Sequence, residues 1–263
     1  MKGLVCGALV ILLWGGVTLA GSLETFFGAG PEGASLRDIN ASILAINTVL
    51  ADWNSTPTLT GGVPELHLLE PGISYVAGER FWISDLFALG GRISTFHTAT
   101  STTGTYTAAG STSQVSVTLG SSAVSLVLGG EVQFLKSPVS LTLDAGIGYY
   151  YAALSSDVTF QTPSGVPVVA IHPHEGRDHF SASTFGVEGG LSLSYWLTDW
   201  LAVGARVGYR STGSLALADG QGNPLDIDGN GTRETMDLTG LTVQFTLSLA
   251  VSLPPLEGER RIP

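Results

Sequence analysis

The stretch LTVQFTLSLAVSL at residues 241–253 alternates apolar and polar side chains from end to end. Its odd positions are Leu, Val or Phe, and its even positions are Thr, Gln or Ser with one Ala. A period of two puts the apolar residues on one face of a single strand. Strands of soluble proteins are usually about 5–6 residues long, whereas a strand that crosses a bilayer needs roughly 9–11. The stretch therefore predicts a strand that spans a membrane with one face toward lipid.

The first 20 residues predict a secretory signal peptide. Lys2 precedes an apolar run at 4–19, and Thr18 and Ala20 are small residues at the positions that a signal peptidase reads. The alternative is a single N-terminal membrane helix, for which the run is short. Cys6 is the only cysteine and lies in this segment, so the mature chain is expected to contain neither a disulfide nor a reactive thiol.

Composition favours a protein that is partly solvated by lipid. Charged residues make up 13% of the chain, against about 25% in an average soluble domain. The formal net charge is −11, and no basic patch is available to neutralise phosphates, which argues against a nucleic-acid partner. No later run has the length of a transmembrane helix, so any span must be made of strands.

The remaining pattern predicts an all-β chain with one amphipathic helix. A first strand is expected at 22–30, and apolar residues spaced three and four apart indicate a helix at 35–54. Further strands are expected at 64–77, 81–97, 114–134, 139–154, 184–196, 201–210 and 238–253. Tight turns at 78–79, 136–138 and 198–199 alternate with long connections, as in outer-membrane barrels. The fold class is therefore an antiparallel up-and-down transmembrane β-barrel of about eight strands, with the helix as a cap or a plug.

Two details refine this expectation. Within 114–134 the apolar residues change from odd to even positions near Gly120, which predicts a bulge there, or ten strands if the segment is really two. Aromatic residues gather near the ends of the predicted strands, which predicts two membrane girdles. One set flanks the tight turns: Tyr75, Phe81, Trp82, Phe134, Tyr195, Trp196 and Trp200. The other lies near the opposite ends: Phe96, Tyr149, Tyr151, Phe185 and Tyr209.

The chain resembles the small outer-membrane β-barrel proteins of bacteria, the eight-stranded porin-like and surface class. The resemblance rests on the signal peptide, the alternating strands and the girdles. The resemblance implies a location in the bacterial outer membrane, contact with its lipid, and insertion by the barrel assembly machinery. Residues 238–245 resemble part of the C-terminal assembly signal of that class. The barrel domain is expected to cover 21–253, followed by a periplasmic tail at 254–263.

The few charged residues inside predicted strands oppose the apolar face. They are of both signs: Arg92, Glu131, Asp144, Glu188 and Arg206. On the lipid face an arginine at mid-depth would cost roughly 2–4 kcal/mol, so these residues are expected to point into the lumen. Two interpretations follow: a network of ion pairs that fills a narrow lumen, or a polar conduit for small solutes. An eight-stranded barrel is just wide enough to be filled by its own side chains, which favours the closed lumen.

The connection before the last strand resembles calcium loops of the EF-hand and dockerin type. Oxygen ligands fall at positions 1, 3, 5, 7, 9 and 12 of the loop: Asp226, Asp228, Asn230, the Thr232 carbonyl, Glu234 and Asp237. Gly231 stands at position 6, where the sharp turn of such a loop requires glycine. Position 12 is Asp rather than Glu, and no flanking helices are predicted. The loop is either a Ca²⁺ site or an acidic hairpin tip.

Three of the five histidines fall within one predicted loop: His172, His174 and His179. In an extended His-x-His segment both imidazoles point the same way, so a third ligand would close a Zn²⁺ or Ni²⁺ site. The alternative is a solvated loop with fortuitous histidines.

Function is expected to follow from the barrel rather than from catalysis. No Ser-His-acid spacing is legible, although His97 lies near Ser101, so an enzyme is not expected. The first interpretation is an integral outer-membrane barrel with a structural or surface-interaction role and a lumen mostly closed by ion pairs. The second is a channel or transporter for small solutes gated by the N-terminal helix. The third is a secreted soluble barrel that binds a ligand inside, which would need apolar residues within and polar residues outside.

Overall fold

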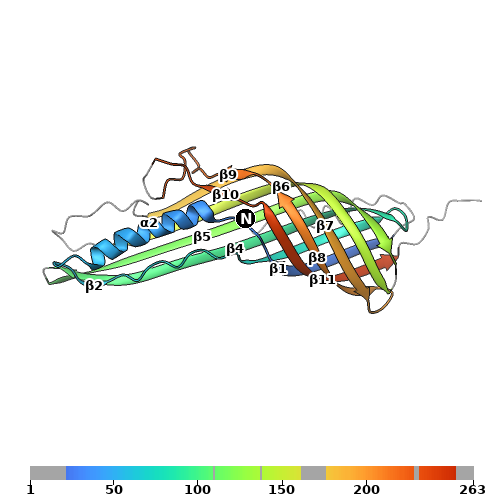
Figure 1. Ribbon diagram of the computed structural model, residues 1–263, viewed down its shortest axis with the longest axis horizontal. Coiled ribbons are helices and arrows are strands. Elements are labelled where there is room, and N and C mark those ends of the chain that lie inside the picture. Colours follow the sequence, from blue (N-terminus) through green and yellow to red (C-terminus); the bar gives the residue numbers. More distant parts are fainter. Residues whose placement is uncertain (1–21, 109, 137, 161–175, 228–230, 253–263) are drawn as a thin grey trace, which may run out of the picture.

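The computed structural model describes residues 22–108, 110–136, 138–160, 176–227 and 231–252 (Figure 1). The expected signal peptide and periplasmic tail lie outside these residues. No helix in the described part of the chain is long and apolar enough to cross a membrane.

Eight of the described strands form a closed antiparallel ring. In ring order they are β1 (Ser22–Pro31), β3 (Ile73–Trp82), β4 (Phe87–Ala108), β5 (Ser111–Leu135), β6 (Val139–Phe160), β7 (Gly176–Trp196), β8 (Leu201–Ser211) and β11 (Gly240–Ser252). Strand β1 pairs with β3 on one side and with β11 on the other, and so closes the ring. The predicted eight-stranded antiparallel barrel is confirmed, and the ten-strand alternative is wrong because 111–135 is a single strand.

The wall of the barrel is uneven in height. Strands β4 to β7 have 21 to 25 residues each, whereas β1, β3, β8 and β11 have 10 to 13. The extra length lies at the end away from the tight turns, so half of the wall protrudes beyond the ring as a curved sheet (Figure 1). Helix α2 (Arg37–Asn54) lies along this protruding sheet together with the short strands β2 (Thr60–Gly62), β9 (Ser214–Ala216) and β10 (Thr235–Asp237).

The predicted turn at 78–79 is wrong. Gly78 and Glu79 lie inside β3, and the chain turns at residues 83–86 instead. The glycine is required for packing, because a Cβ atom at Gly78 would come within 2.4 Å of the Phe26 ring and 2.6 Å of the Gly91 carbonyl oxygen. Its place in the sequence therefore marks a close contact in the lumen and not a reversal of the chain.

The predicted bulge near Gly120 is also wrong. The register of β5 with β4 and with β6 runs through 120–122 without a shift, and the one irregularity of β5 lies between Gln133 and Leu135. Odd positions of β5 face inward from Ser113 to Gln133. The apolar residues change parity because the surroundings of the inward face change. Inward residues between Ser121 and the tight turns meet a polar lumen, and inward residues on the other side of Ser121 meet an apolar core.

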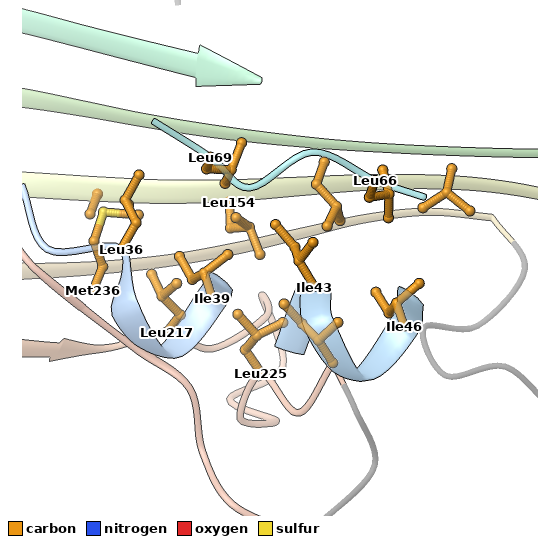
Figure 2. Packing of buried hydrophobic residues seen from close by; sticks show 14 of the residues in the cluster. Leu36, Ile39, Ile43, Ile46, Leu66, Leu69, Leu154, Leu217, Leu225 and Met236 are labelled. Carbon is orange, nitrogen blue, oxygen red and sulfur yellow. The ribbon is translucent and has the colours of Figure 1, made fainter. Parts of the chain in front are cut away.

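That apolar core lies outside the ring, between the protruding strands and α2. Ile39, Ile43 and Leu50 of the helix are completely buried against Leu119 of β5 and Leu154 of β6, among others. Figure 2 shows the helix residues between the 63–69 segment on one side and Leu217 and Leu225 on the other. The molecule thus has two interiors, a charged one inside the ring and an apolar one in the protruding half.

Candidate functional site

The lumen holds a network of ion pairs that contains all five residues singled out in the sequence. Arg206 bonds Asp144 through two nitrogens, Nη2 at 2.7 Å and Nε at 3.0 Å, and Nη1 lies 2.9 Å from Glu188. Arg92 contacts the same two carboxylates at 3.1 Å and 2.9 Å. Glu131 lies 2.8 Å from Arg80. These side chains come from six neighbouring strands, β3 to β8. They meet because even positions of β3, β4, β6, β7 and β8 and odd positions of β5 face inward.

The network has four further members besides those five. Arg80 bonds Glu24 at 2.8 Å near the tight-turn end. At the other end Arg210 pairs with Glu32 at 2.5 Å, and both side chains are 2% exposed. Sequence reasoning missed Arg80 because the turn predicted at 78–79 ended its strand early. Glu24 carried a usable signal, since it alternates with Phe27 and Leu23 on β1.

Glycines make room for the Arg206 side chain. A Cβ atom at Gly190 would lie 2.6 Å from Arg206 Nη2, and one at Gly208 would lie 2.5 Å from Arg206 Nη1. The guanidinium therefore lies flat against the bare backbone of β7 and β8. In a ring of eight strands this packing fills the cross-section with charged groups, and a charged group left without its partner there would be costly.

The outer wall of the ring is apolar. Leu128, Ile147, Leu193 and Val207 are exposed. So are five residues of β11: Leu241, Phe245, Leu247, Leu249 and Val251. Among described residues between the two girdles, Glu79 is the single ionisable side chain on this wall, and it lies beside Thr25 and Gly91 on the neighbouring strands. A wall of this kind is stable when lipid covers it and is an aggregation surface in water.

The aromatic girdles are present with different members. Tyr75, Tyr149, Phe185 and Tyr209 are exposed on the wall near the protruding end, and Phe134, Tyr195 and Trp200 are exposed near the tight turns. Tyr75 was assigned to the wrong end because of the misplaced turn. Phe96 is 3% exposed in the apolar core, and Trp82 and Trp196 line the inside of the barrel mouth, so these three are not girdle residues.

A row of three asparagines fastens α2 to the extended segment 63–69. Asn40, Asn47 and Asn54 are seven residues apart, so they share one face of the helix. Each side-chain amide donates to a backbone carbonyl and accepts from the N–H of the same residue. The partners are Leu69, Leu66 and Val63, at 2.7–3.0 Å. Asparagine at heptad spacing in a helix interior was a legible signal, because Asn is a poor helix former without such a partner.

Three titratable groups outside the ring have pKa values shifted by their local surroundings. Burial raises the pKa of Tyr106, whose hydroxyl donates to Asn54 Oδ1 at 2.9 Å. The Asn223 side chain donates to Asp219 and lowers the pKa of that carboxyl. At the turn 83–86, Lys136 lies 2.7 Å from Asp85 and lowers the pKa of that carboxyl.

The predicted calcium loop is only partly described. Asp226 accepts from the Gly231 N–H at 2.9 Å, and Asp237 accepts from the Thr239 N–H at 2.8 Å. Glu234 is buried and accepts from the Ser42 hydroxyl and from the Ile227 N–H, both at 2.8 Å. Asp228 and Asn230 lie outside the described residues. Ca²⁺ binding therefore stays a prediction, which calorimetry with Ca²⁺ on the native chain and on Asp228→Ala would test.

The predicted histidine site is largely outside the described residues. His172 and His174 fall in 161–175, whereas His179 is an exposed residue of β7 opposite Ser155. Within the described ranges, no group of three or more His, Cys, Asp or Glu side chains is arranged to hold a metal ion. The Zn²⁺ or Ni²⁺ site stays a prediction.

Comparison with known proteins gives distant structural likenesses. No family model and no curated relative matches the chain. The attachment invasion locus protein Ail of Yersinia pestis, crystallised with a heparin analogue, is 10% identical over 89% of this chain and 100% of its own, with a TM-score of 0.40. The outer membrane protein OprG from Pseudomonas aeruginosa is 11% identical over 89% of this chain and 98% of its own, with a TM-score of 0.42. A major outer membrane protein from Thermus thermophilus is 11% identical over 88% of this chain and 100% of its own, with a TM-score of 0.40. The barrel architecture itself rests on the closed ring of strand pairings.

Proposed function

We propose that the chain is an integral protein of the bacterial outer membrane with a structural or surface-interaction role. The observation that carries this is the inverted ring: charged residues such as Arg206 are inside it, and apolar residues such as Ile147 are exposed around it. A soluble ligand-binding barrel needs the opposite arrangement. A closed barrel leaves no strand edge unpaired in the bilayer core.

The connections support one orientation. The short connections between β3 and β4, between β5 and β6 and between β7 and β8 lie at one end. The long connections 32–72 and 212–239 and the protruding half lie at the other end. Outer-membrane barrels have short periplasmic turns and longer extracellular loops, so the protruding half lies outside the cell. Insertion by the barrel assembly machinery follows from the same proposal.

The surface role is supported by the outward face of the protruding sheet, which carries hydroxyl groups. Thr103 and Ser116 are hydrogen-bonded across β4 and β5 at 3.1 Å, and Thr107 and Thr112 at 3.0 Å. These groups offer donors and acceptors to the aqueous layer above the membrane. The apolar face of α2 is covered by the protruding strands and by 63–69, which supports a fixed cap over a closed lumen rather than a gate.

Cysteine labelling of intact cells tests both location and orientation. The expected mature chain has no cysteine, so Thr105→Cys at the protruding end and Ser84→Cys at the tight-turn end are matched reporters. A membrane-impermeant maleimide should label Thr105→Cys on intact cells and Ser84→Cys only after the outer membrane is permeabilised. Equal labelling of both in intact cells, or recovery of unlabelled soluble protein, would contradict the proposal.

Planar-bilayer recording tests the closed lumen. Purified protein should give no steady openings, because the ion pairs of Arg206 and Arg92 fill the ring. Steady conductance by the native chain that persists after deletion of residues 36–53 would favour an open conduit. Conductance that appears only on this deletion would make the helix a gate.

A further inference from the structure

The tight-turn end of the barrel encloses a cavity of about 460 Å³. Small-molecule sites typically have volumes of about 300–1,000 Å³. The cavity is open at the mouth, and its inner end is formed by Arg80 and Glu24, which are ion-paired to each other. Above them lie the remaining ion pairs of the lumen, so the cavity has a closed inner end and one entrance.

Two indole rings face the cavity from opposite walls. Trp82 stands on β3 and Trp196 on β7, and these strands are four places apart in a ring of eight. Trp82 Nε1 donates to Glu24 Oε2 at 3.2 Å, which fixes the ring on its wall. The backbone N–H of Trp196 donates to the Pro138 carbonyl at 2.8 Å, which anchors that residue beside its turn. Aromatic side chains that line the inside of a mouth do not serve as lipid anchors.

The walls between the two indoles carry neutral hydrogen-bonding groups. They are Ser22, Ser84, Gln133, Ser140, Thr142, Ser194 and Thr198. Hydroxyl and carboxamide groups both donate and accept, so they suit a ligand that itself does both. Most charged lining groups are paired with each other, Arg80 with Glu24 and Lys136 with Asp85. With three acids and two bases in the lining, the cavity does not select an anion.

We propose that this cavity binds a neutral saccharide, with a pyranose ring between the Trp82 and Trp196 indoles. The C–H faces of a pyranose are apolar and pack on aromatic rings, while its hydroxyls point sideways to bond the Ser, Thr and Gln side chains. In the orientation given above the mouth opens on the periplasm, where the cell-wall glycan is the polymeric source of such rings. The choice of that source rests on the proposed function, but saccharide binding does not.

Calorimetry on the purified full chain tests the site directly. The probe is an N-acetylglucosamine tetrasaccharide, and the detergent must lack a sugar headgroup because such a headgroup would compete. We expect a Kd of about 1 mM or tighter. Absence of binding heat at probe concentrations well above this expected Kd would overturn the proposal.

Three tryptophan variants separate the site from general effects. Trp196→Ala should weaken binding about tenfold through loss of one stacking surface, whereas Trp82→Phe should largely retain it. Trp200→Ala is the matched control, because Trp200 lies beside the same turn but is 56% exposed on the lipid side. Each variant must first show native gel mobility without heating. Equal weakening by Trp200→Ala and Trp196→Ala would overturn the assignment to this cavity.

Co-sedimentation with purified cell-wall sacculi distinguishes the source. Native protein in the pellet, reduced for Trp196→Ala but not for Trp200→Ala, would support a cell-wall ligand. Binding of the tetrasaccharide without co-sedimentation would keep the saccharide site and overturn the cell wall as its source. A chain found outside the outer membrane would refute the proposed function while leaving the calorimetric result intact.

Discussion

The two halves of strands β4 to β7 use the same faces in opposite ways. Within the ring, the inward face of β6 presents Thr142 and Asp144, and its outward face presents Leu143 and Ile147. In the protruding half, the inward face presents Leu154 and the outward face presents Ser155. From Thr142 onward β6 keeps one register with β5 through both halves, and its register with β7 is continuous. Surroundings, and not strand geometry, therefore decide which face of a β-strand is apolar.

Arg206→Met should cause the largest loss of stability, because it disrupts the ion pairs inside the ring. Asp144 and Glu188 would lose one of the two arginines that they share in the lumen, Arg92 being the other. Removal of one member of a buried ion pair typically costs about 3–5 kcal/mol. The urea midpoint of unfolding, followed by gel mobility without heating, measures the loss. Arg206→Met combined with Asp144→Asn should recover part of it. A single variant as stable as the native chain would contradict the network.

Ile43→Ala should destabilise the packing of the protruding half and leave the ring intact. Ile43 is completely buried under the protruding sheet, and such a truncation costs about 3 kcal/mol. Limited proteolysis should then cut the α2 region faster, while the barrel keeps its native gel mobility. Leu44→Ala is the control, because Leu44 is 56% exposed on the same helix. Loss of the barrel in Ile43→Ala would mean that the two halves fold as one unit.

Asn47→Ala should loosen the contact between α2 and the extended segment. The Leu66 N–H and carbonyl would both lose their partner in a buried setting, at a cost of about 1–3 kcal/mol. Hydrogen exchange should rise at residues 63–69 and stay unchanged in β8. Uniform exchange across both regions would show that the asparagine row does not hold the cap.

Glu79→Leu should stabilise the barrel. It removes the one ionisable side chain described on the outer wall between the two girdles, so the barrel should gain about 1 kcal/mol. The urea midpoint in lipid vesicles should rise. A fall in the midpoint would mean that Glu79 makes a favourable contact within the membrane.

Asp85→Asn should have the smallest effect. The lowered pKa of this carboxyl means that its pairing with Lys136 contributes above the ordinary pKa and is lost as the pH falls through the lowered value. The carboxylate is fully exposed at the turn, so solvent screens the pair. The unfolding midpoint should therefore match the native chain both at neutral pH and in acid. A clear difference at neutral pH would show that the turn is a structural lock.

Alternation and charge placement were sufficient to predict the ring. A period of two along 241–253 specifies a strand with one lipid face, and charges such as Asp144 and Arg206 can lie only inside. Residues at functional positions were harder to predict, because Trp82 and Trp196 look like girdle residues until the parity of their strands is known.

The protruding half could not be predicted because its signals depend on partners distant in the sequence. The parity change at Gly120 was visible, but its cause is an apolar core supplied by Ile43, Leu66 and Met236 from three other segments. Gly78 was misread for a similar reason, since its neighbour Phe26 lies on another strand.

The reversal of apolar and polar faces between the ring and the protruding half also constrains the order of membrane crossing and folding. In the bilayer the hydroxyl-bearing face around Thr103 would meet hydrocarbon, so this half of the sheet has to cross the membrane before it folds. Once Ile43 is enclosed on the far side, withdrawal would first require that core to open in water. In the proposed orientation this half folds outside the cell, so its buried core would oppose withdrawal of the chain through the membrane.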